Sequence, residues 1–274
     1  MVRSFFGFFL GTFFYLTRFR FQVVRANWER FVPHPSRFLI MASYYHFGCL
    51  CCELLLLPLG RLKQYVLKHV TVVGSEHLLA AHRAGRGFIC VVAHSGNWEI
   101  MAAACTLKFQ VPLLIVTKSI KPKWLHRLIT RGRAQCGVQA TYEPQTMRDI
   151  LAAFKRGDAI GVVLDQYVGP PVGVRVPFFG VPVGTASVVA VLAKRYQVPV
   201  LLIENWRSFS EHHIVVHPPF VLEQGSLGEL TAQYVGAVES AIDRHPAQWL
   251  WTHRRFKGNL GPLESGEWDL RARV

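Results

Sequence analysis

Residues Phe88 to Met101 read FICVVAHSGNWEIM, and this stretch decides the fold that the sequence predicts. The apolar run at its start is rich in β-branched residues, which is typical of a strand buried on both faces of an α/β sheet. His94 comes at the carboxyl end of that strand, Gly96 allows a sharp turn, and Asn97 is a good N-cap for the helix that follows. We therefore expect a strand, a turn and a helix to meet at His94.

A carboxylate, Glu99, falls in the first turn of that helix. The helix dipole favours its ionised form by roughly 0.3–1 kcal/mol, and the turn can bring it back toward the imidazole of His94. Since a His held by a carboxylate can take a proton from a substrate hydroxyl, we predict His94 as a general base and Glu99 as its orienter. Ser95 as a nucleophile is the rival hypothesis, but AHSGN is not the G-x-S-x-G elbow of hydrolases.

The composition favours one domain that contacts a membrane. A chain of 274 residues can bury one large core, and a hydrophobic fraction of 51% is high for a freely soluble protein. The formal net charge of +14 indicates an anionic partner, either nucleic acid, acidic lipid or an acidic carrier protein, with a plain solvated surface as the alternative. The cysteines lie mostly in apolar runs, which indicates reduced thiols in a cytoplasmic environment.

The sequence predicts a membrane-associating segment at residues 1–30 and one main domain at residues 31–274. From Ser4 to Thr17 the chain is uncharged and rich in Phe, with arginines after it. A transmembrane helix needs about 20 apolar residues, so the pattern favours an interfacial helix, with a signal peptide as the competing interpretation. A second apolar stretch, Phe38 to Leu59, contains the ionisable Glu53 and is interpreted as a core or docking helix.

After residue 74, strands and helices alternate, which predicts an α/β domain with a mixed sheet flanked by helices. The predicted strands are Phe88–Ala93, Val111–Val116, Ala159–Leu164 and Val198–Ile203, and the predicted helices cover residues 98–108, 146–156, 186–196 and 226–245. His213 and His217 alternate with Val215 on a further short strand. Because no acidic or thiol residue accompanies these histidines and His212, we interpret them as surface residues rather than metal ligands.

A basic stretch runs from Lys118 to Arg133, with six Lys or Arg interleaved with large apolar residues. This mixture suits a lipid surface better than a nucleic-acid groove, where a helix-turn-helix or a stacking sheet is expected. The plain alternative is a solvated helix face. Arg131 is the residue of this stretch that we assign to a ligand phosphate or to the acidic residues of the site.

A third cluster, Leu164 to Thr185, begins with Asp165 and Gln166 at the end of a buried strand, where ligand sites of α/β proteins open. A loop rich in Pro and Gly follows. It carries Arg175 and the apolar pair Phe178-Phe179, so that a polar head and an apolar wall occur together. Although plain surface structure would account for such a loop, the combination favours a shaped ligand pocket.

In their order and spacing, these motifs resemble the bacterial lipid A late acyltransferases, the lauroyl and myristoyl transferases of the lysophospholipid acyltransferase superfamily. The resemblance covers most of the chain. The matching motifs are H-x4-D/E at His94 and Glu99 with Gly96-Asn97-Trp98 between them, the family's arginine at Arg131, DQ at Asp165-Gln166, V-x-F-F-G at Val176–Gly180, P-x-x-T at Pro182 and Thr185, and an aromatic and basic segment at Gln248–Lys257.

The resemblance implies a glycerolipid acyltransferase-like α/β domain at the cytoplasmic face of a bacterial inner membrane. It implies transfer of a fatty acyl chain from an acyl-carrier-protein or acyl-CoA thioester to a hydroxyl of a membrane glycolipid, such as a lipid A precursor, or of a phospholipid. It implies no metal, cofactor or nucleic acid, and an anionic membrane surface as partner. The implied substrate-binding residues are Asn97, Arg131, Asp165, Gln166, Arg175, Phe178, Phe179 and Thr185.

Two alternatives stay open at the level of sequence. One is a lysophospholipid acyltransferase that uses acyl-CoA. The other is a catalytically silent lipid- or membrane-binding protein, in which His94 and Glu99 are a satisfied polar pair at a strand end. Loss of acyl transfer in His94→Ala with membrane binding intact would separate an enzyme from a binding protein.

Overall fold

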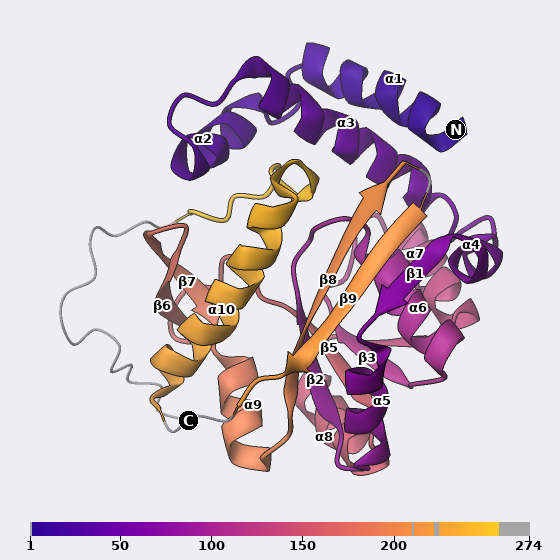
Figure 1. Ribbon diagram of the computed structural model, residues 1–274, viewed down its shortest axis with the longest axis vertical. Helices are drawn as coiled ribbons and strands as arrows, with labels where there is room; N and C mark the ends of the chain where they lie inside the picture. Colours follow the sequence, from indigo (N-terminus) through magenta and orange to yellow (C-terminus); the bar gives the residue numbers. More distant parts are fainter. Residues whose placement is uncertain (1, 210, 222–224, 258–274) are drawn as a thin grey trace.

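The computed structural model describes residues 2–209, 211–221 and 225–257. In this part of the chain, a seven-stranded mixed sheet has the order β1-β9-β8-β2-β5-β3-β4, and a two-stranded hairpin, β6-β7, stands apart from it (Figure 1). The strands are β1 (Val70–Val73), β2 (Phe88–Val92), β3 (Leu113–Val116), β4 (Val138–Thr141), β5 (Ala159–Val163), β6 (Gly173–Phe178), β7 (Val181–Ala186), β8 (Val200–Ser208) and β9 (Glu211–Pro219).

The helices cover both faces of the sheet and one of its ends (Figure 1). They are α1 (Val2–Leu16), α2 (Phe21–Phe31), α3 (Arg37–Leu54), α4 (Leu62–His69), α5 (Ser75–Arg83), α6 (Trp98–Phe109), α7 (Lys123–Gln135), α8 (Thr146–Arg156), α9 (Val188–Tyr196) and α10 (Leu227–Arg244), with a 3₁₀ turn η1 (Pro246–Gln248). The α/β domain with a mixed sheet flanked by helices is therefore confirmed.

Strand β2 lies at the middle of the sheet, parallel to both β5 and β8. All five of its residues are buried, as its apolar run predicts. Ile89 and Val91 join the core beneath α8, α9 and α10, whereas Phe88, Cys90 and Val92 join the core beneath α4, α5 and α6. The sheet is mixed because β9 runs antiparallel to β8, and β1 pairs in parallel with β9.

Helices α1 and α3 pack against each other through glycines. A Cβ atom added at Gly48 would overlap backbone atoms of Gly7 and Gly11, so only glycine permits this close approach. Both helices lie across the end of the sheet toward which β8 points (Figure 1). Among the described residues, no helix is both long enough and apolar enough to cross a membrane. The predicted N-terminal apolar helix is present, and its association with a membrane stays a proposal.

Two predictions from the sequence need correction. The Pro- and Gly-rich loop after Gln166 is largely the antiparallel hairpin β6-β7, in which Val174, Val176 and Phe178 alternate inward. His212 is not a surface residue: it is 1% exposed, because it faces Glu53 of α3. Across the described ranges, no group of three or more His, Cys, Asp or Glu side chains has an arrangement suited to a metal ion.

Candidate active site

The side chain of His94 is bound to Asp165, which follows the neighbouring strand. His94 Nδ1 lies 2.8 Å from Asp165 Oδ1, and the backbone N–H of His94 donates to Oδ2 at 2.7 Å. The register of the sheet explains this contact: Val92 of β2 pairs with Val163 of β5, and each polar residue comes two positions after its strand partner. The parallel pairing of β2 with β5 therefore places the carboxylate beside the imidazole.

Asp165 is 2% exposed, and its carboxyl is nevertheless ionised at neutral pH. Burial alone would raise the pKa of this carboxyl, but the electrostatic interaction with His94 and hydrogen bonds from His94 and the Trp249 indole lower it to about 2. An ionised Asp165 can only accept hydrogen bonds, so Nδ1 of His94 carries the proton and Nε2 presents its lone pair. This is the tautomer that a general base requires.

The Nε2 atom of His94 faces the side-chain amide of Gln166, with 3.3 Å between the two nitrogen atoms. The imidazole packs edge-to-face on Trp98, with ring centroids 4.8 Å apart. The His94 side chain is 15% exposed, so the imidazole is largely buried but still in contact with solvent. The structure thus brings three residues from the predicted site together: His94, Asp165 and Gln166.

Glu99 has a different partner from the one predicted. Both of its carboxylate oxygens are bound by Arg133 of α7, whose Nε donates to Oε2 at 2.9 Å and whose Nη2 donates to Oε1. Both side chains are buried. The predicted pairing of Glu99 with His94 is therefore corrected: Asp165 holds the ring, and Glu99 ties the first turn of α6 to α7.

Arg133 of α7, and not the predicted Arg131, binds the acidic Glu99. Arg131 is exposed, and its contact with a ligand phosphate stays a prediction. Two residues apart on a helix, the side chains point roughly 200° apart, so only one of them can face the core. Arg133 lies four residues after Ile129 and three before Cys136, both packed in the core, and helical spacing places all three on one face. That apolar spacing is the signal in the sequence that identifies Arg133.

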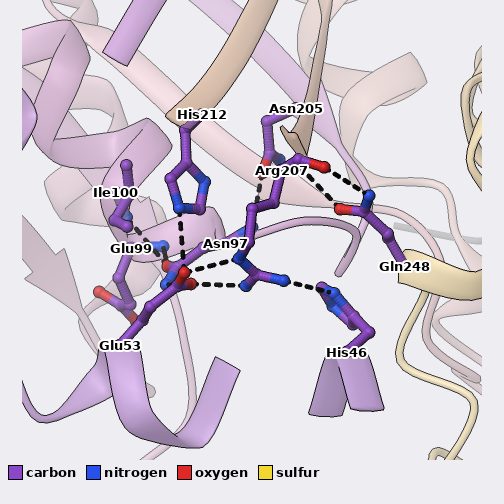
Figure 2. A network of polar contacts seen from close by, with 9 residues as sticks. All are labelled: His46, Glu53, Asn97, Glu99, Ile100, Asn205, Arg207, His212 and Gln248. Atoms are coloured by element: carbon purple, nitrogen blue, oxygen red, sulfur yellow. Dashed lines mark hydrogen bonds and ion pairs between the residues drawn. The ribbon is translucent and has the colours of Figure 1, made fainter. Parts of the chain in front are cut away.

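Asn97 is the N-cap of α6, as predicted, and its side-chain oxygen accepts from the backbone N–H groups of Glu99 and Ile100, both at 3.1 Å. Its side-chain amide donates to Glu53 at 2.9 Å, so both ends of the amide bind protein (Figure 2). Gly96 before it has φ +57°, and a Cβ atom there would overlap Asn205. The turn is thus fixed by local contacts, and Asn97 positions the site rather than presenting a free group to a ligand.

The β6-β7 hairpin contributes mainly to the core. Phe178 is fully buried because strand alternation turns it inward, and its place in the wall of a substrate pocket stays a prediction. Phe179 is partly buried, packs edge-to-face on Phe31 with centroids 4.8 Å apart, and has φ +47° at the tip of the hairpin. Arg175 lies on the opposite face of β6 and is half-buried. Ligand contacts of Phe179 and Arg175 stay predictions.

Arg255 is a site residue that the sequence reasoning missed. It is fully buried, and its guanidinium donates to Gln166 O at 2.6 Å, Gly184 O at 2.8 Å and Thr185 Oγ1 at 2.6 Å. Burial lowers its pKa to about 10, although Asp165 opposes the shift. Thr185, predicted to bind substrate, is thus fully buried and bound to Arg255. The closing aromatic and basic segment, which also supplies the Trp249 indole to Asp165, was the available signal.

Comparison with known proteins gives the family. Residues 1–258 match the family model described as bacterial lipid A biosynthesis acyltransferase. The chain is 25% identical over 246 residues to the phosphatidylinositol mannoside acyltransferase of Mycobacterium tuberculosis (strain ATCC 25618 / H37Rv), covering 88% of this chain and 76% of that protein.

Two proteins of Escherichia coli (strain K12) are also similar. The lipid A biosynthesis palmitoleoyltransferase is 27% identical over 195 residues, and the lipid A biosynthesis lauroyltransferase is 24% identical over 196 residues. Each alignment covers 70% of this chain and 63% of the relative. With a family model matched over nearly its whole length, the chain belongs to the bacterial lipid A biosynthesis acyltransferase family, a family of acyl-transferring enzymes.

Proposed function

We propose that this protein transfers a fatty acyl chain from a thioester donor to a hydroxyl of a membrane glycolipid such as a lipid A precursor. The observation that carries the proposal is the contact of His94 with the ionised Asp165, which leaves a basic nitrogen at the carboxyl end of the central strand β2. The similar proteins are named as acting in lipid A biosynthesis or on phosphatidylinositol mannoside, which supports a glycolipid acceptor.

The reaction follows from the tautomer of His94. The acceptor hydroxyl takes the place of the Gln166 amide at Nε2, and its proton moves to Nε2 as its oxygen bonds to the thioester carbonyl carbon. The carbon–sulfur bond then breaks, and the leaving thiolate takes the proton from Nε2. Asp165 stabilises the intermediate imidazolium through Nδ1. General-base catalysis of this kind contributes roughly 10²–10⁴ in rate.

The donor is an acyl-carrier-protein or acyl-CoA thioester in this proposal. Both donors are anionic, and the net charge of +14 favours either of them. Basic residues gather on and before α7, where Trp124 is 62% exposed. We assign this surface to anionic headgroups or to the anionic part of the donor.

We place the enzyme on the cytoplasmic face of a bacterial inner membrane, with α1 lying in the interface. Five Phe side chains of this helix are each between 55% and 60% exposed. They are Phe5, Phe6, Phe8, Phe9 and Phe13. So much exposed aromatic surface on one helix marks a membrane or protein contact, and the arginines that follow α1 favour anionic lipid.

Lipid mass spectrometry of source cells with and without the gene tests the proposal. We expect cells without the gene to accumulate a glycolipid that is one acyl chain short, and the wild-type gene but not His94→Ala to restore it. Unchanged glycolipid acylation would overturn the proposal. Accumulation of lysophospholipid would favour the lysophospholipid acyltransferase instead, and full restoration by His94→Ala would exclude the base mechanism.

Purified protein then identifies the donor. Glycolipid extract from the deleted cells is offered with acyl-acyl-carrier-protein in one reaction and acyl-CoA in another. The donor that supports turnover is the one used, and membrane binding without turnover from either donor would favour the non-catalytic alternative.

A further inference from the structure

Glu53, near the carboxyl end of α3, is at the centre of a buried polar network (Figure 2). Its carboxylate is bound at both oxygens by Arg207 of β8, with Nε–Oε1 and Nη2–Oε2 distances of 2.6 Å. His212 of β9 approaches Oε1 at 3.2 Å, and the side-chain amide of Asn97 donates to Oε2 at 2.9 Å. Glu53 is 3% exposed. Its carboxylate joins α3, the two strands β8 and β9, and the active-site turn, which is the stretch 95–97 between His94 and α6.

The same network holds the active-site turn from its other side. The backbone N–H of Asn97 donates to the Asn205 side chain at 2.6 Å, and Gly96 N–H donates to Gln248 O at 3.0 Å. The Gln248 amide makes two hydrogen bonds with the backbone of Arg207, each 2.8 Å long. Hydrogen bonds to β8, η1 and α3 therefore hold the residues between His94 and α6 in place.

A path of direct contacts leads from Glu53 to the imidazole. Glu53 fixes the side chain of Asn97, which caps α6, and the first residue of α6 is Trp98, whose ring packs on His94. A displacement of Asn97 moves Trp98, and the Trp98 ring packs against the imidazole that carries Nε2. Such displacements matter, because a misplacement of about 1 Å can cost roughly 10²-fold in rate.

We infer that Glu53 and Arg207 are positioning residues for acyl transfer, and that α3 is thereby part of the catalytic apparatus. The inference rests on the proposed role of His94. A buried ion pair is not required for stability alone, since apolar residues of similar volume often replace such pairs without loss. What the pair supplies here is a fixed orientation of Asn97, and through it of the wall beside His94.

The first test replaces the pair by apolar residues, Glu53→Leu with Arg207→Met. Both charges leave together, so neither is stranded in the core, while the hydrogen bond to Asn97 is lost. We expect a folded protein with a lower Tm, because the buried Asn97 and His212 also lose a hydrogen-bond partner. Binding to anionic vesicles should be unchanged, kcat lowered about 10–100-fold and KM within about twofold. A folded variant with wild-type kcat would overturn the inference.

A more conservative variant covers the case in which the double replacement does not fold. Glu53→Asp keeps a carboxylate for Arg207 but withdraws it from Asn97 by one methylene. We expect a lowered kcat here too, and a wild-type kcat would again overturn the inference. In an Asn97→Ala background, Glu53→Asp should add little further loss, whereas a full additional loss would show that Glu53 does not act through Asn97.

The matched control is the ion pair of Arg156 with the buried Asp158, which lies at the end of α8, on the opposite side of the molecule from α3 (Figure 1). Arg156→Met with Asp158→Leu also removes an ion pair with a buried carboxylate, although the arginine is 51% exposed here, and should leave kcat unchanged. His94→Ala separates the two hypotheses: an active His94→Ala variant would defeat the proposed function. An inactive His94→Ala beside a fully active Glu53→Leu/Arg207→Met variant would defeat only this inference.

Discussion

At the scale of single residues, the proposed chemistry depends on which carboxylate meets the imidazole. Asp165 binds both the ring and the backbone N–H of His94, and the Trp249 indole donates to its second oxygen. Three donors to one buried carboxylate keep it ionised. An ionised Asp165 determines which nitrogen of His94 carries the proton, and so whether Nε2 can act as a base.

Replacing Asp165 by Asn tests this assignment of the tautomer. An amide at residue 165 can donate to Nδ1, which would move the ring proton to Nε2 and remove the base. We expect kcat to fall roughly 10²–10⁴-fold with the fold retained. The measurement is steady-state acyl transfer together with a circular dichroism melt, and Asp158→Asn, also at a buried carboxylate, is the control. Wild-type turnover by the Asp165→Asn protein would rule out Asp165 as the orienter.

The depressed pKa of Asp165 predicts how stability depends on pH. Its carboxyl titrates at about 2 in the folded protein and at 3.8 ordinarily, so its ionised form stabilises the fold above about pH 4. That contribution, roughly 2 kcal/mol, is lost as the pH falls toward 2. Urea unfolding of wild type and Asp165→Asn should show a difference in unfolding free energy that shrinks below about pH 4. A difference independent of pH would contradict the assigned pKa.

The sequence led to the family and to His94 as the candidate base, but it assigned the wrong carboxylate to the ring. Glu99 is five residues from His94 in the chain, and local turn geometry made it the natural candidate. Asp165 is 71 residues away and reaches His94 because β2 and β5 pair in parallel, with both residues two positions beyond paired strand residues. Strand order comes from long-range packing, so a pattern read along one segment cannot supply it.

At the scale of elements, the α1-α3 pair depends on close approach at glycines. Gly48→Ala places a methyl group against the backbone of α1, so the helices must separate, and we expect the unfolding free energy to fall by about 1–3 kcal/mol. Gly236→Ala is the control, because Gly236 of α10 has open space around it; there alanine should stabilise by roughly 0.5–1 kcal/mol. Chemical denaturation measures both. Equal effects of the two replacements would show that the glycine contact is unimportant.

Elements with strong local signals were predicted well. Helix α8 has the predicted bounds, and α10 begins at the Ser226–Glu229 capping box, within one residue of prediction. The hairpin β6-β7 was predicted as a loop, because Pro177, Pro182 and several glycines are usually strand breakers. Strand pairing overrides that preference here, as Pro177 and Pro182 face each other in a two-stranded hairpin with open edges.

At the scale of the whole molecule, the end of the sheet that carries His94 and the apolar helix α1 lie together. Helices α1 and α3 cover the end toward which β8 points, and β2, parallel to β8, delivers His94 to that same end (Figure 1). If α1 rests in a lipid surface, the reactive nitrogen lies on the side of the molecule nearest the acceptor. The helix that attaches the protein to the membrane would then also turn His94 toward the lipid acceptor.

This arrangement predicts the effect of removing aromatic surface from α1. Phe9 and Phe13, 55% and 58% exposed, are four residues apart and so share one face of the helix. Burying one such side chain in lipid is worth about 1.5–3 kcal/mol, so Phe9→Ser with Phe13→Ser should weaken binding to phosphatidylglycerol vesicles more than 100-fold, as roughly two such contributions are lost. Sedimentation with vesicles measures the partition.

Tyr196→Ser on α9, at the opposite end of the sheet from α1, is the matched aromatic control and should bind like wild type. Because the serines leave the site near His94 intact, turnover of a detergent-dispersed acceptor should persist, and undiminished vesicle binding would exclude α1 as the membrane contact.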